Sequence, residues 1–190
     1  MSLVIITVER EKRTHTIHSD GIEVRNDYMD IASQSCNKIR KLEYKGHSIL
    51  VGTCGHCTIG RYIRNHITEY LEEFRVFEKM HEHIDDVEEF FIRMFRKMYD
   101  AYKEDMHTEH YVEFTCALSI DGHLFSVQNY DDGEVDCRVL TDSDILCIGL
   151  GGDIATALIE NDVPIKKVFA TVHRHKTCVG ENMYTLSANF

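Results

Sequence analysis

The feature that most constrains the fold is a pair of long helical segments between two sets of strand-like segments. From Thr58 to Phe74 the apolar residues recur at helical spacing, and a second such segment runs from about Asp85 to Tyr102. Shorter segments with strand-like patterns precede and follow this pair. Because each sheet needs an apolar cover, this order predicts two stacked sheets with helices on both outer faces.

The strands before the helices begin with a predicted hairpin. Residues 2–9 form its first strand, residues 10–13 a charged turn, and Thr14–Ser19 its second strand, which ends at Asp20-Gly21. A glycine-containing corner, Gly52-Thr53-Cys54-Gly55, leads into the first helix. The further strands expected in this half are Ile22–Val24, Lys38–Leu42 and Ser48–Gly52.

The strands after the helices include a second predicted hairpin, because Asp121-Gly122 is a strong hairpin-turn signal. A short helix is expected near Asp153, and a last helix over about Ile165–Lys176. The strands expected in this half are Val112–Ile120, Leu124–Asn129, Asp136–Leu140, Ile145–Ile148 and Asn182–Ser187. The whole pattern predicts one α+β domain over residues 1–190, arranged as a four-layer αββα sandwich.

Composition excludes several classes of function. The 190 residues are 43% hydrophobic, which suits one globular domain, and the formal net charge of -11 argues against nucleic-acid or anionic-membrane partners. No apolar run reaches the length of a membrane span, so we expect a cytoplasmic protein. Seven cysteines, an odd number, favour reduced and mostly buried thiols over a disulfide framework.

The N-terminus offers a nucleophile with its own base. Methionine is normally trimmed before a small residue, so removal of Met1 is expected to expose Ser2. A free α-amine has a pKa near 8, and it can accept the hydroxyl proton of its own residue at neutral pH. Ser2 is therefore a candidate nucleophile.

The spacing of motifs downstream resembles a known family. Ser2 leads to Asp20-Gly21, Lys38-Ile39 precedes the Gly52–Gly55 corner by about fourteen residues, and Ile148-Gly149-Leu150-Gly151-Gly152 precedes a helix. This set is similar to proteasome β-type subunits of the N-terminal-nucleophile hydrolases, most closely HslV-type peptidase subunits, over most of the chain. The resemblance implies the four-layer αββα fold of that family.

The resemblance also implies roles for four residues. Ser2 would be the nucleophile, Lys38 would supply positive charge beside it, Asp20 would pair with Lys38, and the Gly52 amide would help to form the oxyanion hole. The implied substrate is a peptide or an unfolded protein, cleaved inside a homo-oligomeric ring with a possible ATPase unfoldase as partner. No cofactor and no metal are implied.

Three positions depart from the family pattern. Leu150 stands where the family has serine, and the family's polar helpers before the final strand correspond to about Lys176 and Val179. Nearby polar residues that could compensate are His173, His175 and Thr177. Either the proton relay is rebuilt here, or the chain is a catalytically inactive ring-forming or binding protein on the same scaffold.

Other groups of residues invite different chemistry. Cys54-Gly55-His56-Cys57 has thiolate and imidazole ligands that suit zinc, and His173, His175 and Cys178 form a second such group. A Cys54 nucleophile with a histidine base is a further alternative, although no spacing singles out that pair. Gly149–Gly152 lacks the rest of a phosphate-binding motif. We favour structural packing for all of these residues.

Overall fold

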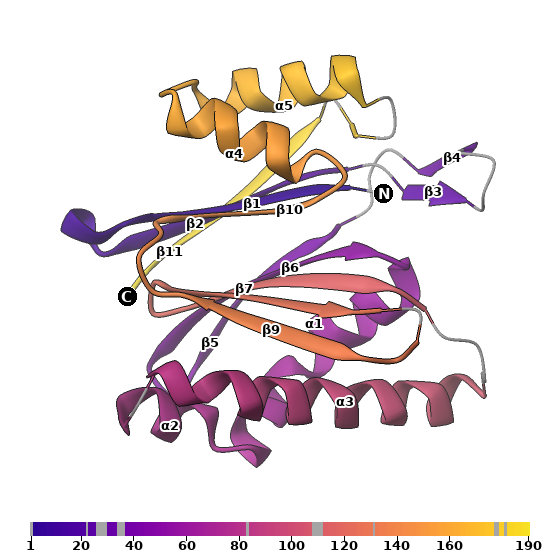
Figure 1. The fold of residues 1–190 in the computed structure, drawn as a ribbon, viewed down its shortest axis with the longest axis vertical. Helices are drawn as coiled ribbons and strands as arrows, with labels where there is room; N and C mark the ends of the chain where they lie inside the picture. Colours follow the sequence, from indigo (N-terminus) through magenta and orange to yellow (C-terminus); the bar gives the residue numbers. More distant parts are fainter. Residues whose placement is uncertain are drawn as a thin grey trace.

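Two antiparallel sheets stack face to face between two layers of helices (Figure 1). The computed structural model describes residues 2–21, 23–25, 30–33, 37–82, 84–107, 112–130, 132–176, 179–180 and 182–190. The layers follow the order α4 (Gly152–Glu160) and α5 (Ile165–His175), first sheet, second sheet, and the helices of the mid-chain segment 57–106. The predicted four-layer αββα arrangement is therefore confirmed.

The first sheet contains the N-terminal hairpin at its centre. Its strand order is β10-β1-β2-β11, and a 3-10 turn at Arg10–Lys12 joins β1 to β2. The C-terminal strand β11 closes one edge by pairing with β2. The bounds are β1 Leu3–Glu9, β2 Thr14–Asp20, β10 Ile145–Gly149 and β11 Met183–Asn189.

The second sheet is an antiparallel meander of five strands in the order β5-β6-β7-β8-β9. Two-residue turns join β5 to β6 and, at the predicted Asp121-Gly122, β7 to β8, whereas the helices of the mid-chain segment come between β6 and β7. The bounds are β5 Ile39–Tyr44, β6 His47–Gly55, β7 Phe114–Ile120, β8 His123–Asn129 and β9 Val135–Leu140. A separate pair, β3 Glu23–Arg25 and β4 Asp30–Ser33, lies outside both sheets.

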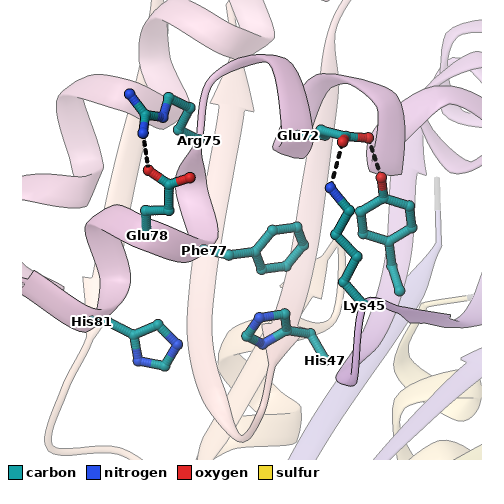
Figure 2. Close-up of a pocket in the computed structure, with 8 residues that line it drawn as sticks. Lys45, His47, Glu72, Arg75, Phe77, Glu78 and His81 are labelled. Atoms are coloured by element: carbon teal, nitrogen blue, oxygen red, sulfur yellow. Dashed lines mark hydrogen bonds and ion pairs between the residues drawn. The ribbon is translucent and has the colours of Figure 1, made fainter.

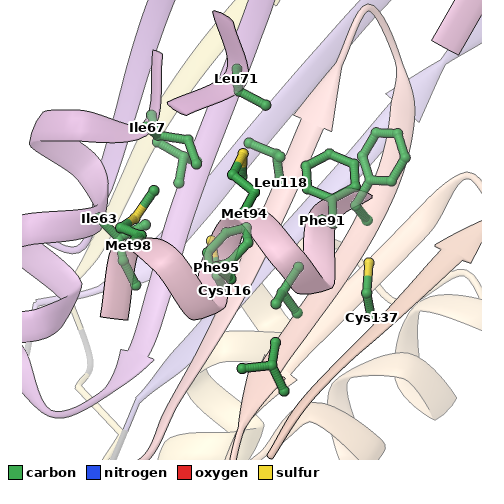
Figure 3. Packing of buried hydrophobic residues seen from close by; sticks show 14 of the residues in the cluster. Ile63, Ile67, Leu71, Phe91, Met94, Phe95, Met98, Cys116, Leu118 and Cys137 are labelled. Atoms are coloured by element: carbon green, nitrogen blue, oxygen red, sulfur yellow. The ribbon is translucent and has the colours of Figure 1, made fainter. Parts of the chain in front are cut away.

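The helices cover the two outer faces because each has one apolar stripe. In α1, residues Ile59, Ile63, Ile67 and Leu71 are fully buried, and they pack with the buried face of α3 against the second sheet (Figure 3). The bounds are α1 Cys57–Glu73, α2 Val76–Glu82, α3 Val87–Met106, α4 Gly152–Glu160 and α5 Ile165–His175.

Strand β1 is buried on both faces. Leu3 and Ile5 pack against α4 and α5, whereas Val4 and Ile6 pack between the two sheets. Successive side chains of a strand point to opposite faces, so a strand between two apolar layers must be apolar throughout. Residues Leu3 to Ile6 are therefore fixed inside the sandwich.

Several element boundaries differ from those predicted. The first predicted helix ends as α1 at Glu73, and α2, which was not predicted as a separate helix, starts at Val76 after a break at Arg75, which has a positive φ of 55°. Strand β6 continues to Gly55, past the expected end at Gly52. A 3-10 turn, Ile84–Asp86, precedes α3, and strand β4 was not predicted. Ile22, Cys36, Thr177 and Cys178 lie outside the described residues.

A buried histidine links the two sheets near the turn between β1 and β2. His15 of β2 is fully buried, and its ring nitrogens Nδ1 and Nε2 lie 2.7 Å from the hydroxyls of Ser119 and Ser48 respectively. These serines belong to β7 and β6. Burial lowers the pKa of His15 to about 4, so the ring is neutral at pH 7.

This lowered pKa makes stability depend on pH. The unfolded chain, with a histidine pKa near 6.5, binds the proton more readily than the folded state between about pH 6.5 and 4. The stability contributed by neutral His15 is thus present above pH 6.5 and is lost as the pH falls toward 4. Between pH 7 and pH 4, the free energy of unfolding of wild type should fall by about 2–3 kcal/mol more than that of His15→Gln. Urea unfolding at each pH measures this difference.

The matched control is His66→Gln, because the His66 side chain on α1 is 40% exposed. Its free energy of unfolding should follow that of wild type at each pH. A difference between wild type and His15→Gln that does not change with pH would show that His15 is not held neutral by burial.

Candidate active site

Three polar residues from different strands meet at the end of the sandwich where the chain begins. Ser2 precedes β1, Asp20 ends β2, and Lys38 precedes β5 in the other sheet. Their exposed fractions are 3%, 0% and 6% respectively, so all three are buried. Buried charged groups of this kind are stable only when they are paired and hydrogen-bonded.

The Asp20 carboxylate joins three segments of the chain. Its Oδ1 atom accepts hydrogen bonds from the Leu3 backbone N–H at 2.9 Å and from the Lys38 Nζ at 3.0 Å. Its Oδ2 atom accepts a hydrogen bond from the Gly180 N–H at 3.0 Å. The carboxylate therefore holds the residue after Ser2, the lysine, and the segment before β11 around one point.

The backbone of Ser2 is held by the loop after β10. The Ser2 carbonyl accepts a hydrogen bond from the Leu150 N–H at 3.0 Å. The preceding residue, Gly149, has a φ of 96°, and a Cβ there would lie only 2.0 Å from the Ser2 carbonyl oxygen. Only glycine permits this approach. The glycine-rich loop thus acts in packing and positioning.

Gly52 lies in the middle of β6, beside Lys38. The next residue, Thr53, donates its N–H to the Lys38 carbonyl at 3.0 Å. A Cβ on Gly52 would lie 2.7 Å from Val4 and 2.8 Å from Ile17, so this glycine faces the packed space between the sheets. The structure explains why a glycine stands here, and the oxyanion role of its amide stays a prediction.

Cys54, near the end of β6, also belongs to the site. Its thiol hydrogen-bonds with the Ser2 side chain and lies 3.7 Å from the Ile148 carbonyl oxygen. Burial raises the pKa of the thiol to about 12, more than the nearby Lys38 charge lowers it. A thiol that stays protonated at pH 7 is a poor nucleophile and a poor metal ligand. This finding argues against the cysteine-nucleophile alternative.

The three departures from the family pattern have different surroundings. Leu150 is 43% exposed directly beside Ser2, whereas Val179 is fully buried in the apolar cluster under α4 and α5. His173 hydrogen-bonds through Nδ1 to the Val179 carbonyl. Lys176 is partly buried just after α5. None of these contacts supplies a hydroxyl beside Ser2.

The described residues contain no group of three or more His, Cys, Asp or Glu side chains arranged to hold a metal ion. They also contain no helix long and apolar enough to cross a membrane. The second group considered as an alternative zinc site, His173, His175 and Cys178, falls partly outside the described residues.

A surface pocket lies away from this site (Figure 2). It is formed around the β5–β6 turn, which is at the opposite end of these strands from Lys38 and Gly55. The Phe77 ring stacks on His47, and the cations in the pocket are each paired with a carboxylate, Lys45 with Glu72 and Arg75 with Glu78. The pocket therefore offers no unpaired charge and plays no part in the proposed site.

Comparison with known proteins finds similarity in structure. No protein-family model matches the chain, and no curated protein sequence does. The HslV structure from Trypanosoma brucei has a TM-score of 0.61 and 13% sequence identity, with 99% of each chain covered. BPH from Thiobacillus denitrificans, in complex with epoxomicin, has a TM-score of 0.62 and 12% identity, with 98% of each chain covered.

A third structure, the helical assembly of the Anbu complex from Pseudomonas aeruginosa, has a TM-score of 0.60 and 13% identity. It covers 100% of this chain and 81% of the Anbu chain. Matches of this length at such low identity establish the architecture. The chain has the proteasome β-subunit-like fold that HslV and Anbu also have.

Proposed function

We propose that this protein is a peptidase subunit of the HslV-like and proteasome-like type, with Ser2 as its nucleophile after removal of Met1. The observation that carries the proposal is the buried Asp20 carboxylate, which binds Lys38 and the Leu3 N–H directly after the buried Ser2. The fold match supports the proposal, because Ser2 directly precedes β1, the strand that opens the fold.

In the proposed mechanism the α-amine of Ser2 is the general base. The amine takes the proton from the Ser2 hydroxyl as Oγ attacks the carbonyl carbon of the peptide bond. The Oγ–C bond forms, the C–N bond breaks, and the amine product leaves with a proton. Water then hydrolyses the acyl ester on Ser2 and restores the hydroxyl.

Lys38 and Asp20 act on this step through charge and position. The Lys38 ammonium favours the neutral form of the nearby α-amine, which is the form that can accept a proton. Asp20 holds Lys38 in place and fixes the Leu3 N–H directly after the nucleophile. Backbone donors such as the Gly52 amide, aimed at the developing oxyanion, would add about 3–4 kcal/mol of stabilisation to the transition state.

Confinement inside an assembly is the second part of the proposal. We propose a homo-oligomeric ring, with an ATPase unfoldase as a possible partner. The assembly reported for the Anbu complex supports association of subunits with this fold.

The second candidate function is a catalytically inactive ring-forming or binding protein. The observation that favours it is Leu150, an apolar side chain directly beside Ser2 that cannot take part in proton transfer. Covalent labelling of Ser2 by an inhibitor distinguishes the peptidase from the catalytically inactive protein.

The first test uses epoxomicin, the compound bound in the Thiobacillus denitrificans BPH structure. Protein that begins at Ser2 should gain the mass of one epoxomicin per chain, because the probe reacts with an N-terminal nucleophile. Ser2→Ala should lose the labelling and the cleavage of small peptide amides by several orders of magnitude, with unchanged thermal unfolding. Absence of labelling on fully trimmed protein would leave the fold assignment intact and contradict the peptidase.

The second test removes the buried cation. Lys38→Ala should slow labelling by at least about 100-fold and lower the free energy of unfolding by about 3–5 kcal/mol, because Asp20 then loses its charged partner. The double variant Asp20→Asn, Lys38→Met removes both charges, so it should be more stable than Lys38→Ala and still be inactive. Urea unfolding and labelling rates measure the two effects.

The matched control is Lys41→Ala on β5, since the Lys41 side chain is 38% exposed and pairs with Glu43 at 3.8 Å on the surface. Its stability should change by less than about 1 kcal/mol. Full labelling of Lys38→Ala would contradict the role given to the cation.

A further inference from the structure

The side chains of Ser2 and Cys54 come from different sheets and face the same space. The Leu150 N–H bonds the Ser2 carbonyl and so extends the β1–β10 ladder by one residue. Side chains two apart on a strand share a face, so Ser2 continues the row of Val4 and Ile6. Both of these residues belong to the apolar cluster between the sheets, as does Cys54 of β6. Ser2 and Cys54 therefore approach each other across that space.

The backbone at Gly149 brings the Cys54 sulfur close to Ser2. A Cβ on Gly149 would lie 2.0 Å from the Ser2 carbonyl oxygen and 2.9 Å from the Cys54 sulfur. Any other residue at this position would push the two atoms apart, since both distances are far shorter than a van der Waals contact. The glycine thus lets the sulfur of one sheet pack beside the Ser2 backbone of the other.

The Cys54 thiol has two polar neighbours. Its S–H donates to the Ile148 carbonyl oxygen at 3.7 Å, and the thiol also hydrogen-bonds with the Ser2 side chain. A thiol carries one proton and its sulfur is a weak acceptor, so the Ser2 hydroxyl donates to the sulfur. Because such a bond is weak, it can hold the hydroxyl in place and still release its proton to the α-amine.

This contact bears on the departure at Leu150. The family pattern has a serine there, whereas here the loop contacts Ser2 through backbone atoms, with the Leu150 N–H on the Ser2 carbonyl and the Leu150 side chain 43% exposed. Ser2 itself is only 3% exposed, and a buried hydroxyl needs a hydrogen-bond partner. Cys54 offers that partner from the opposite sheet.

We propose that Cys54 is a positioning residue, whose sulfur accepts the hydrogen bond of the Ser2 hydroxyl and holds Oγ in the space between the two sheets. The kinetic consequence of this contact rests on the proposed function, whereas the contact itself does not. Cys54 acts as a neutral thiol, because burial keeps it protonated at pH 7.

Infrared spectroscopy tests the contact without any reaction. The S–H stretch of a thiol absorbs where other protein groups do not, and hydrogen bonding moves it to lower wavenumber. The Cys54 band is the difference between the full-length chain that begins at Ser2 and its Cys54→Ala variant. In the Ser2→Ala background the same difference should show the band at higher wavenumber. An identical Cys54 band in both backgrounds would overturn the inference.

The matched control is the band of Cys116 on β7. Cys116 is as deeply buried as Cys54, but it packs in the cluster beside α1 and α3. Its band, obtained with Cys116→Ala, should be the same with and without the Ser2 hydroxyl. Equal shifts of both bands would show that Ser2→Ala alters the packing generally, and would contradict a specific contact.

The kinetic test compares Cys54→Ser with Cys54→Ala, which differ by one hydroxyl. Inactivation by epoxomicin separates the affinity for the probe from the rate constant of the covalent step. Cys54→Ala should lower that rate constant about 10- to 100-fold with affinity unchanged, because Oγ is no longer held in place. Cys54→Ser should recover the rate constant to within about threefold of wild type, since its hydroxyl accepts the same bond. Cys116→Ser should label like wild type.

The outcomes separate this inference from the peptidase proposal. Equal rate constants for Cys54→Ser and Cys54→Ala would contradict positioning, and a change in probe affinity alone would make Cys54 a substrate contact instead. Probe attached to Cys54 in peptide mapping would overturn both proposals. A shifted Cys54 band in trimmed wild type that takes no label would support the contact and contradict the peptidase.

Discussion

The Asp20 carboxylate is the interaction on which the arrangement of the candidate site depends. It accepts hydrogen bonds from Leu3, Lys38 and Gly180, which come from the first strand, the second sheet and the segment before the last strand. A fully buried carboxylate without these partners would cost several kcal/mol. The hydrogen bonds that stabilise this buried charge therefore also fix the geometry around Ser2.

The sandwich supplies the environment in which this carboxylate acts. Strand β1 is apolar on both faces, so its N-terminal end is held between the helix layer and the second sheet. At Gly149 and Gly52 an added Cβ would clash with the Ser2 carbonyl and with Val4 respectively, so the backbone packs closely on both sides of β1. The proteasome β-subunit-like fold thus holds Ser2 and β1 beside a buried cation.

The sequence predicted the architecture well because strand and helix periodicities are local signals. It also predicted that Asp20 and Lys38 would pair, by resemblance to the family spacing. It did not predict the break at Arg75, because a left-handed residue between two helices has no apolar signature. The contact of Cys54 with Ser2 depends on the packing of two different sheets, which no local pattern encodes. The exposure of Leu150 was equally a property of the tertiary structure.

In the proposed mechanism Ser2 becomes the first residue and acts through its own α-amine. The sharpest test is intact-mass analysis with N-terminal sequencing of the purified chain. We predict a mass that lacks one methionine and a sequence that begins Ser2-Leu3-Val4. A protein that quantitatively retains Met1 would have no free amine on Ser2, and that result would contradict the proposed mechanism.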